Sequence, residues 1–209
     1  MEINTDEFML DLRNEKVLPE VNKINAVYWK AWDTVLLLRR IVFEDEKARM
    51  AKLVRVEELP EDIDKGKLAI AAMENTIKKN GLLFGKSIEV IKEMSVKAGI
   101  LDEEDELPIL SDDFYVLTSK KGKKGATFMF SIPTMMDIAD KIGADKYLVA
   151  PMSIDLVAIF PGVDKKEIAF DMLKMANNIT NGKEDILSNK IFIFNKQTMN
   201  YTLALEEQS

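Results

Sequence analysis

The side chains that could do chemistry in this chain are carboxylates, lysines, arginines and hydroxyls, because its 209 residues include no histidine and no cysteine. The commonest general base and transition-metal ligand is therefore missing, as are thiol nucleophiles and thiolate metal sites. Triads that need imidazole cannot form, and neither can disulfides. The sequence favours a protein without enzymatic activity, so no catalytic residue, metal ligand or cofactor is assigned.

The densest basic feature is the run KKGKK, in which Lys120, Lys121, Lys123 and Lys124 surround one glycine. One interpretation is an anion clamp at a hairpin tip, which would contact phosphate or an acidic partner surface. The alternative is a solvated turn whose lysines keep two edge strands soluble. The formal net charge of −7 makes nucleic acid the less expected ligand, because proteins that grip phosphate backbones are usually basic.

A second basic cluster lies nearer the N-terminus, where Arg39 and Arg40 follow Trp29 and Trp32. Aromatic rings beside guanidinium groups could form a stacking platform for bases. The alternative places both tryptophans in the core, since tryptophan is highly buried on average, and leaves the arginines facing solvent.

The remaining carboxylates and serines form no recognisable catalytic motif. The block DEEDE at 102–106 offers the oxygen ligands that Mg²⁺ or Ca²⁺ takes, but it lacks the spacing of a calcium loop, so an acidic linker is favoured. Ser131 and Ser153 lack the accompanying motifs of a serine–lysine enzyme, and there is no P-loop. A carboxylate-based, Mg²⁺-dependent hydrolase remains the third hypothesis, behind a binding protein and a nucleic-acid-associated protein.

The elements that must position these groups are predicted from periodicity and breaker residues. In the first half, an amphipathic helix is expected at 4–22, since Phe8 and Leu12 share a helical face. Strands are expected at 26–43 and 48–57, because the first is rich in β-branched and aromatic residues. A helix is the alternative for 26–43, since Trp29, Trp32, Leu36 and Arg40 also fit a helical stripe. Helices are expected at 65–79, ending at Asn80–Gly81, and at 86–98.

The second half alternates hairpins and helices. A β-hairpin is predicted from 113–119 and 125–131 with the lysines at its tip, and a helix follows from Thr134 to Gly143. The next predicted elements are strands 146–151 and 155–160, a helix to about 180, and strands 190–196 and 199–206. The order β-β-α-β-β-α-β-β predicts an α+β fold of antiparallel sheets with helices on one face. The predicted domains are 1–101 and 106–209, or one continuous domain.

Three stretches of the second half are ELPILSDDFYVLTSKKGKKGATFMF, IADKIGADKYLVAPMSIDLVAIFP and ANNITNGKEDILSNKIFIF. They resemble an uncharacterised bacterial family of unknown function that is common in mobile elements. They are similar to the family's "YVLTN…GAA", "YILPSSIHEVIL-P" and "EEVLSD" stretches. The family's His-Glu pair is replaced here by Asp155-Leu156, and the family implies a fold but no reaction. The matching positions are Tyr115 to Thr118, Gly125, Ala126, Tyr147 to Ile154, Val157, Pro161, Asn177, Asn178 and Asp185 to Ser188.

The acidic N-terminal stretch carries no signal peptide, and no apolar run reaches the length of a membrane span, so a cytoplasmic protein without membrane contact is expected. Methionines on the predicted helices, Met135, Met136, Met172 and Met175, would fill a core or form an adaptable protein-binding face. The most favoured function is a non-enzymatic protein-binding or regulatory module, carried by a mobile element or phage. Its partner would be another protein, with nucleic acid as the alternative.

Overall fold

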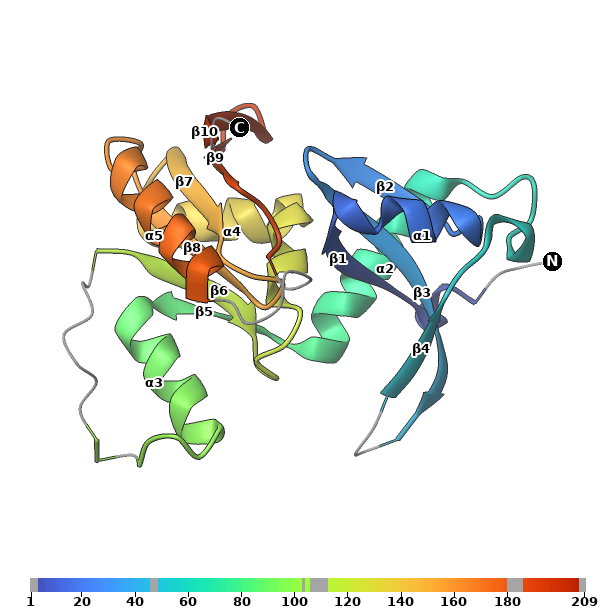
Figure 1. Ribbon diagram of the computed structural model, residues 1–209, viewed down its shortest axis with the longest axis horizontal. Coiled ribbons are helices and arrows are strands. Elements are labelled where there is room, and N and C mark those ends of the chain that lie inside the picture. The colour runs from blue at the N-terminus through green and yellow to red at the C-terminus, as the bar shows by residue number, and fades with distance from the viewer. Residues whose placement is uncertain (1–3, 46–48, 103, 106–112, 180–185, 207–209) are drawn as a thin grey trace. The chain divides into compact units, whose positions relative to one another are not determined.

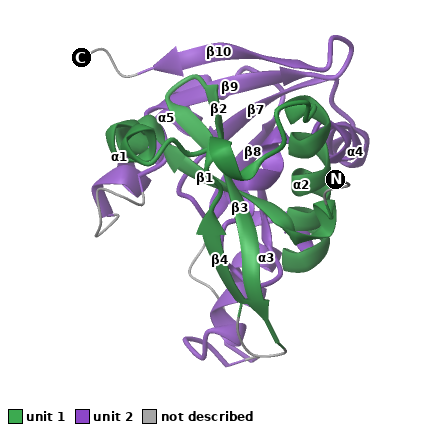
Figure 2. Ribbon diagram, turned by 90° about the vertical axis from the view of Figure 1, so that its right-hand side faces the viewer, with its two compact units in different colours: residues 1–81 green, residues 82–209 purple. Residues whose placement is uncertain are grey.

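The computed structural model describes residues 4–45, 49–102, 104–105, 113–179 and 186–206. The chain divides into two compact units, Met1–Gly81 (unit 1) and Leu82–Ser209 (unit 2), which Figure 2 shows in separate colours. Each unit contains an antiparallel sheet with helices, so the predicted α+β class is confirmed. The seam predicted at 102–106 falls on a segment of which residues 103 and 106 lie outside the described part of the chain.

Unit 1 contains a sheet of order β1-β3-β2, and β4 pairs with the far end of β3 (Figure 1). The predicted strand 26–43 is interrupted by a turn at Trp32–Asp33, which separates β2 from β3. The predicted partner strand at 48–57 is confirmed in its first half, as β4, and its end belongs to η3. The elements are η1 (Thr5–Glu7), β1 (Phe8–Asn14), η2 (Glu15–Val17), α1 (Leu18–Lys23), β2 (Tyr28–Ala31), β3 (Thr34–Glu44), β4 (Arg49–Leu53), η3 (Val56–Glu58) and α2 (Lys65–Asn80).

The helix predicted at 4–22 is wrong over most of its length, because residues 8–14 form strand β1 and only α1 is helical near the predicted end. The side chains of Phe8 and Leu12 satisfy a helical spacing, but the intervening Leu10 also satisfies the period of two that a strand requires. Pairing with β3 along the whole of β1 selects the strand. The local spacing is compatible with a helix, but the pairing with β3, which is distant in sequence, decides the structure.

Helix α2 begins and ends as predicted. The side chain of Asp64 accepts hydrogen bonds from the backbone N–H groups of Gly66 and Lys67, and the helix ends at Gly81, whose φ is 70°. Two side chains of this helix satisfy backbone groups of the edge strand β1. Asn75 Nδ2 donates to Phe8 O at 3.1 Å, and Leu10 N–H donates to Thr76 Oγ1 at 2.8 Å. The helix thus covers polar groups that an edge strand would otherwise expose.

Unit 2 contains a sheet of order β10-β9-β7-β8-β6-β5, in which all pairs are antiparallel. Strand β5 pairs with β6 and was not predicted, because its five residues lie between two helices, with only Gly81 separating it from the first. The elements are β5 (Leu82–Lys86), α3 (Ser87–Lys97), β6 (Tyr115–Ser119), η4 (Gly125–Phe130), α4 (Ile132–Ile142), β7 (Lys146–Pro151), β8 (Leu156–Pro161), α5 (Lys166–Ile179), β9 (Lys190–Asn195) and β10 (Asn200–Glu206).

The two faces of this sheet carry different helices. On one face, alternate residues of the strands, such as Leu148 and Phe160, join one core cluster with Val90 of α3 and Leu173 of α5. On the other face, Tyr147 reaches α4, where its hydroxyl donates to Met135 O at 2.7 Å. The sequence predicted that the helices cover one face of the sheet. In the structure α3 and α5 cover one face, whereas η4 and α4 cover the other.

The β-hairpin predicted from 113–119 and 125–131 is wrong in its second strand, which is the 3₁₀ helix η4. Strand β6 instead pairs with β5 on one side and with β8 on the other, so both of its edges are already occupied. The apolar run 125–130 is then buried against the sheet, with Ala126, Phe128 and Met129 at most 1% exposed. Because consecutive residues of this segment are buried, its apolar residues do not alternate with polar ones, and the sequence pattern does not distinguish a strand from a helix.

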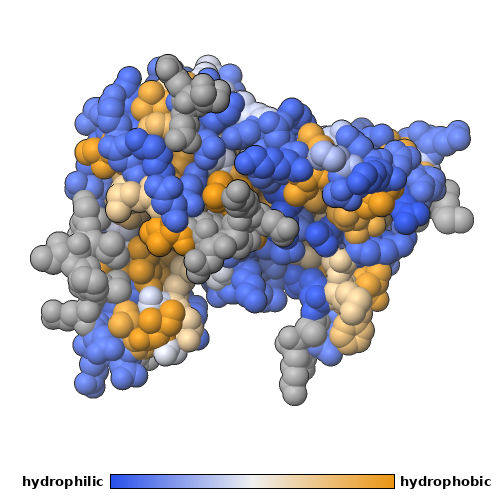
Figure 3. All heavy atoms as spheres, in the orientation of Figure 1, coloured by the Kyte–Doolittle hydropathy of each residue, from blue (hydrophilic) through white to orange (hydrophobic). Residues whose placement is uncertain are grey.

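The surface is mainly hydrophilic on the face shown in Figure 3, and hydrophobic side chains are scattered in spots over both units. The more exposed apolar residues include Phe43 and Met50, which are paired across β3 and β4, and Ile168, Met175 and Ile179 on α5. Met135, by contrast, is fully buried, so the predicted methionine set is divided between core and surface. Within the described residues, the helices are too short or too polar to cross a membrane.

Candidate binding site

The four lysines occupy the connection between β6 and η4, which we call the lysine loop (residues 120–124). Ser119, fully buried at the end of β6, folds this loop back on itself. Its carbonyl accepts from Gly122 N at 2.8 Å, and its Oγ accepts from Lys123 N at 3.1 Å and donates to Lys123 O at 2.7 Å. One small polar side chain therefore holds both backbone groups of Lys123.

The segment that leads into β8 braces the same loop from the other side. Asp155 Oδ1 accepts from Lys124 N at 2.5 Å, and Asp155 O accepts from Thr118 Oγ1 at 2.7 Å. Asp155 is itself held by Ser153, whose Oγ accepts the Asp155 N–H at 3.1 Å. Hydrogen bonds to an ionised carboxylate are stronger than those between neutral groups, so Asp155 is a main fixing point of the loop.

Backbone packing adds a steric constraint at Gly125. A Cβ placed there would lie 2.4 Å from Thr118 Cα, 2.5 Å from Ser119 N and 2.6 Å from Asp155 O, all of them backbone atoms. The loop also passes through two residues with positive φ, Gly122 at 66° and Lys124 at 60°. A left-handed conformation is uncommon for a lysine and indicates that the surrounding bonds determine the backbone there.

The loop presents positive charge to solvent. Lys120, Lys121 and Lys123 are exposed and Lys124 is half-buried. Within the described part of the chain, the ammonium groups of Lys120, Lys121 and Lys123 form no ion pair. A fixed cluster of cations on an acidic protein creates a local field that attracts anionic groups.

Removing the Asp155 carboxylate should loosen the loop without removing any lysine. We expect Asp155→Ala to lower the free energy of unfolding by about 1–2 kcal/mol, because the Lys124 N–H loses a charged acceptor. Asp155→Asn keeps an acceptor oxygen and should cost less than half of that. Hydrogen exchange at Lys123 and Lys124, measured for the three proteins, should rise in the order wild type, Asn, Ala. Equal exchange in all three would show that Asp155 does not hold the loop.

The second predicted basic cluster is already engaged by carboxylates within unit 1. Arg39 Nε lies 2.7 Å from Asp11 Oδ2, and the Asp11 side chain is only 2% exposed. Arg40 Nε lies 2.9 Å from Glu7 Oε2, and its guanidinium group lies over the Phe8 ring. The two arginines are consecutive in β3 and so point to opposite faces of the sheet. Their charges are compensated and divided between the two faces.

The two tryptophans do not complete a platform with these arginines. Trp29 in β2 pairs with Leu36, four residues along β3 from Arg40, which corresponds to about 13 Å. Trp32 lies in the β2–β3 turn with φ of 55°, and both rings are partly exposed. Neither ring is therefore fully in the core, and the structure does not gather them with Arg39 and Arg40 into one surface.

The carboxylates and serines considered as catalytic groups have structural partners. Asp105 Oδ2 accepts from Asp102 N at 2.9 Å in a turn, and residues 103 and 106 of that acidic block lie outside the described chain. Ser131 Oγ caps α4 by accepting from Thr134 N. No group of three carboxylates that could hold a metal occurs within the described ranges.

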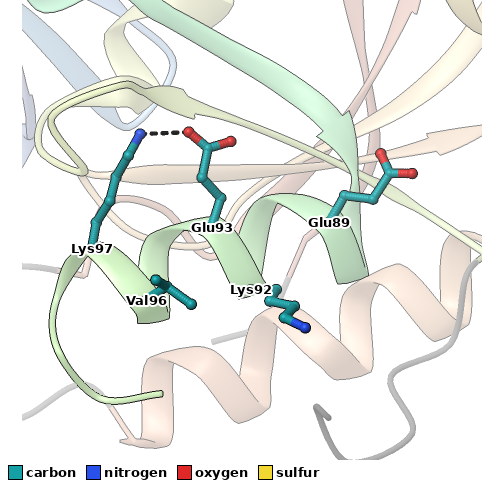
Figure 4. A pocket seen from close by; sticks show the side chains of 5 residues that line it. All are labelled: Glu89, Lys92, Glu93, Val96 and Lys97. Atoms are coloured by element: carbon teal, nitrogen blue, oxygen red, sulfur yellow. Dashed lines mark hydrogen bonds and ion pairs between the residues drawn. The ribbon is translucent and has the colours of Figure 1, made fainter. Parts of the chain in front are cut away.

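A shallow hollow on α3 is lined by Glu89, Lys92, Glu93, Val96 and Lys97 (Figure 4). Lys97 Nζ donates to Glu93 Oε1 at 2.5 Å, so part of its charge is internally paired. All five residues belong to one helix, and the hollow brings no catalytic group from another element. It therefore offers a mixed-charge surface and no assembled chemistry.

Two tyrosines, the buried Tyr147 and the partly exposed Tyr201, fix α4 and η4 to the sheet. The Tyr147 hydroxyl donates to Met135 O, and the Tyr201 hydroxyl donates to Met129 O at 2.5 Å. Burial raises the pKa of both phenols well above the ordinary value near 10. Because these hydroxyls stay protonated and satisfy backbone carbonyls, they are structural groups and are unsuited to act as bases.

The sequence identified the lysines, and the structure adds the residues that hold them. Thr118, Gly125 and Asp155 all lie at or beside positions quoted for the family resemblance, and that resemblance was the available signal. Ser119 stands where the resembling stretch has Asn, and both residue types bond readily to nearby backbone groups. Asn177 in the third stretch donates to Ser188 O at 3.1 Å, while Asp185 lies outside the described residues.

Unit 2 is thus an α+β unit in which a braced, cationic loop follows strand β6 of a six-stranded antiparallel sheet. A family model described as "Family of unknown function (DUF5688)" matches residues 13–196, which is most of the chain. The protein belongs to this family. No curated protein and no solved structure gives a significant match.

Proposed function

We propose that this protein is a non-enzymatic, cytoplasmic module that binds another protein through the lysine loop. The observation that carries the proposal is the bracing of the loop by Ser119 and Asp155, which fixes the backbone while Lys120, Lys121 and Lys123 stay exposed. This bracing presents the three exposed lysines on a backbone of fixed shape. Fixing the backbone before binding lowers the entropy lost when a partner docks.

A regulatory or docking role agrees with the chemistry of the described residues. The Ser119 hydroxyl and the Asp155 carboxylate are used in hydrogen bonds to the loop backbone. The serines considered as nucleophiles, Ser131 and Ser153, accept backbone N–H groups of neighbouring segments. The positive loop contrasts with the net negative charge of the whole chain, so a partner with an acidic surface would be oriented by it.

Nucleic acid is the less supported ligand. The arginines that a base-stacking surface would use are paired with Asp11 and Glu7, and the strand geometry separates them from Trp29. A nucleic-acid-associated function predicts salt-dependent binding of single-stranded DNA or RNA at low salt. The fluorescence anisotropy of labelled single strands measures this directly.

Neutralising the loop should abolish partner capture. The loop variant replaces Lys120, Lys121, Lys123 and Lys124 with Gln. The matched control replaces four exposed lysines elsewhere, Lys16, Lys65, Lys78 and Lys146, and so changes the net charge equally. With each protein as bait in lysate of the source cells, we expect a salt-sensitive partner to be retained by wild type and control and lost by the loop variant.

The captured partner is then purified and titrated against all three proteins, which separates direct binding from co-purification. Circular dichroism melts show that each variant is folded. If the loop variant retains the same partners with the same affinity as the control, the proposed function is wrong. If none of the three proteins captures a specific partner, the result also counts against it.

A further inference from the structure

Resting on the proposed function, we infer that the lysine loop binds an extended acidic segment of its partner, one in which several Asp or Glu side chains follow one another along the chain. The inference depends on which groups of the loop remain available to a ligand. These are the exposed ammonium groups of Lys120, Lys121 and Lys123, because hydrogen bonds within unit 2 occupy the backbone N–H groups of residues 122–124.

Three consecutive backbone N–H groups of the loop, those of residues 122–124, donate to acceptors within unit 2. Gly122 N donates to Ser119 O, Lys123 N to Ser119 Oγ and Lys124 N to Asp155 Oδ1. Just after the loop, Ala126 N donates to Ile154 O at 3.3 Å. Compact anions such as phosphate are typically held by several converging backbone N–H groups at a nest or helix N-terminus. The N–H groups of residues 122–124 already have acceptors within unit 2, so they do not converge on a phosphate.

The side chains instead spread their charge over a wider surface. The lysines occur in two pairs separated by Gly122, and the backbone turns through left-handed conformations at Gly122 and Lys124. Each ammonium group ends a flexible stem and acts as a point charge rather than a planar clamp. Carboxylates spaced along an extended peptide, about 3.3 Å per residue, can meet such separate charges one by one.

The loop also lacks the groups that single-stranded nucleic acids need besides charge. Sites for single strands combine cations with aromatic rings on which bases stack. The segment from Ser119 to Gly125 reads SKKGKKG and contains no aromatic residue. The loop therefore supplies the charge that carboxylates require, without the stacking surface that bases require.

The test uses a labelled poly-glutamate peptide, a poly-glutamine peptide of the same length and an oligothymidylate of the same length, each followed by fluorescence anisotropy against the intact protein. We expect the glutamate peptide to bind with an affinity that falls as salt rises, and the glutamine peptide not to bind. The variant with all four loop lysines changed to Gln should bind the glutamate peptide at least about tenfold more weakly. The scattered-lysine control should stay within about twofold of wild type.

The other outcomes separate this inference from the proposed function. If the glutamate peptide does not bind, or binds the loop variant as well as the control, while the captured protein still requires the loop, the inference is wrong and the proposed function stands. Competition by inorganic phosphate at equal ionic strength would assign the loop to a compact anion and overturn the inference. Tighter, loop-dependent binding of the oligothymidylate would overturn both.

Discussion

Gly125→Ala is expected to destabilise unit 2 by about 3 kcal/mol or more, because the new methyl group would overlap three backbone positions at once. The contacts to Thr118 Cα, Ser119 N and Asp155 O are all at or below 2.6 Å. A flexible side chain could rotate away from such a contact, but these atoms belong to β6 and to the segment entering β8. Relief would require moving one strand segment away from another.

The measurement should resolve the two units, because a single unfolding midpoint need not describe a chain with two compact parts. Both tryptophans lie in unit 1, so their fluorescence during urea unfolding follows that unit. Hydrogen exchange of β6 and β8 follows unit 2. We expect Gly125→Ala to accelerate exchange in β6 and β8 strongly and to change the tryptophan transition much less.

Gly85→Ala is the matched control for this substitution. It also lies in unit 2, and its added Cβ would meet the Val90 Cγ2 methyl at 3.2 Å, a side-chain contact that can adjust. Its cost should stay near or below about 1 kcal/mol. If Gly125→Ala were no more destabilising than Gly85→Ala, the close approach of η4 to β6 would not exist in solution.

Alkaline pH should destabilise unit 2 through the buried Tyr147. The pKa of Tyr147, whose side chain is fully buried, is raised far above its ordinary value near 10 by loss of solvation. A raised folded pKa means that the phenol contributes its full stability below about pH 10, and that this stability is lost as pH rises further, because only the unfolded chain ionises. At about pH 12 the loss from Tyr147 alone should reach about 2–3 kcal/mol.

Tyr147→Phe separates this titration from other effects of high pH. Near neutral pH the variant should be less stable by about 1 kcal/mol, because the hydrogen bond to Met135 O is lost. Above about pH 10 its stability should fall less steeply than that of wild type, so that the difference narrows and then reverses. Urea unfolding at a series of pH values, followed by far-ultraviolet circular dichroism, gives the change of the unfolding free energy with pH for each of the two proteins. Parallel slopes for the two proteins would contradict the assignment.

Local signals were sufficient for several elements. Helix α2 follows from its apolar spacing, from Asp64 as its N-terminal cap and from Gly81 at its end, all of which act within one turn. Strands β7 to β10 were predicted because short β-branched and aromatic runs are separated by turn residues. The absence of histidine and cysteine, which excludes whole classes of chemistry, is a property of the sequence alone.

The errors occurred where long-range pairing decides the structure. Residues 8–14 carry both a helical and a strand pattern, and β3 selects the strand by pairing along their length. Residues 125–130 could not pair with β6, because β5 and β8 already occupy both of its edges. Strand propensity depends on the neighbours a segment finds, so it could not identify these segments in isolation.

Some features of the candidate site follow from the sequence, and others follow only from the tertiary structure. The sequence by itself determined that four lysines surround Gly122 in an acidic protein, and that any function of this loop would depend on positive charge. Only the tertiary structure brought Ser119, Gly125 and Asp155 together beneath it, although Asp155 is more than 30 residues away from the loop. The physical reason is that β8 pairs with β6, which places the segment before β8 beside the end of β6. That pairing turns a run of lysines into a loop of fixed shape.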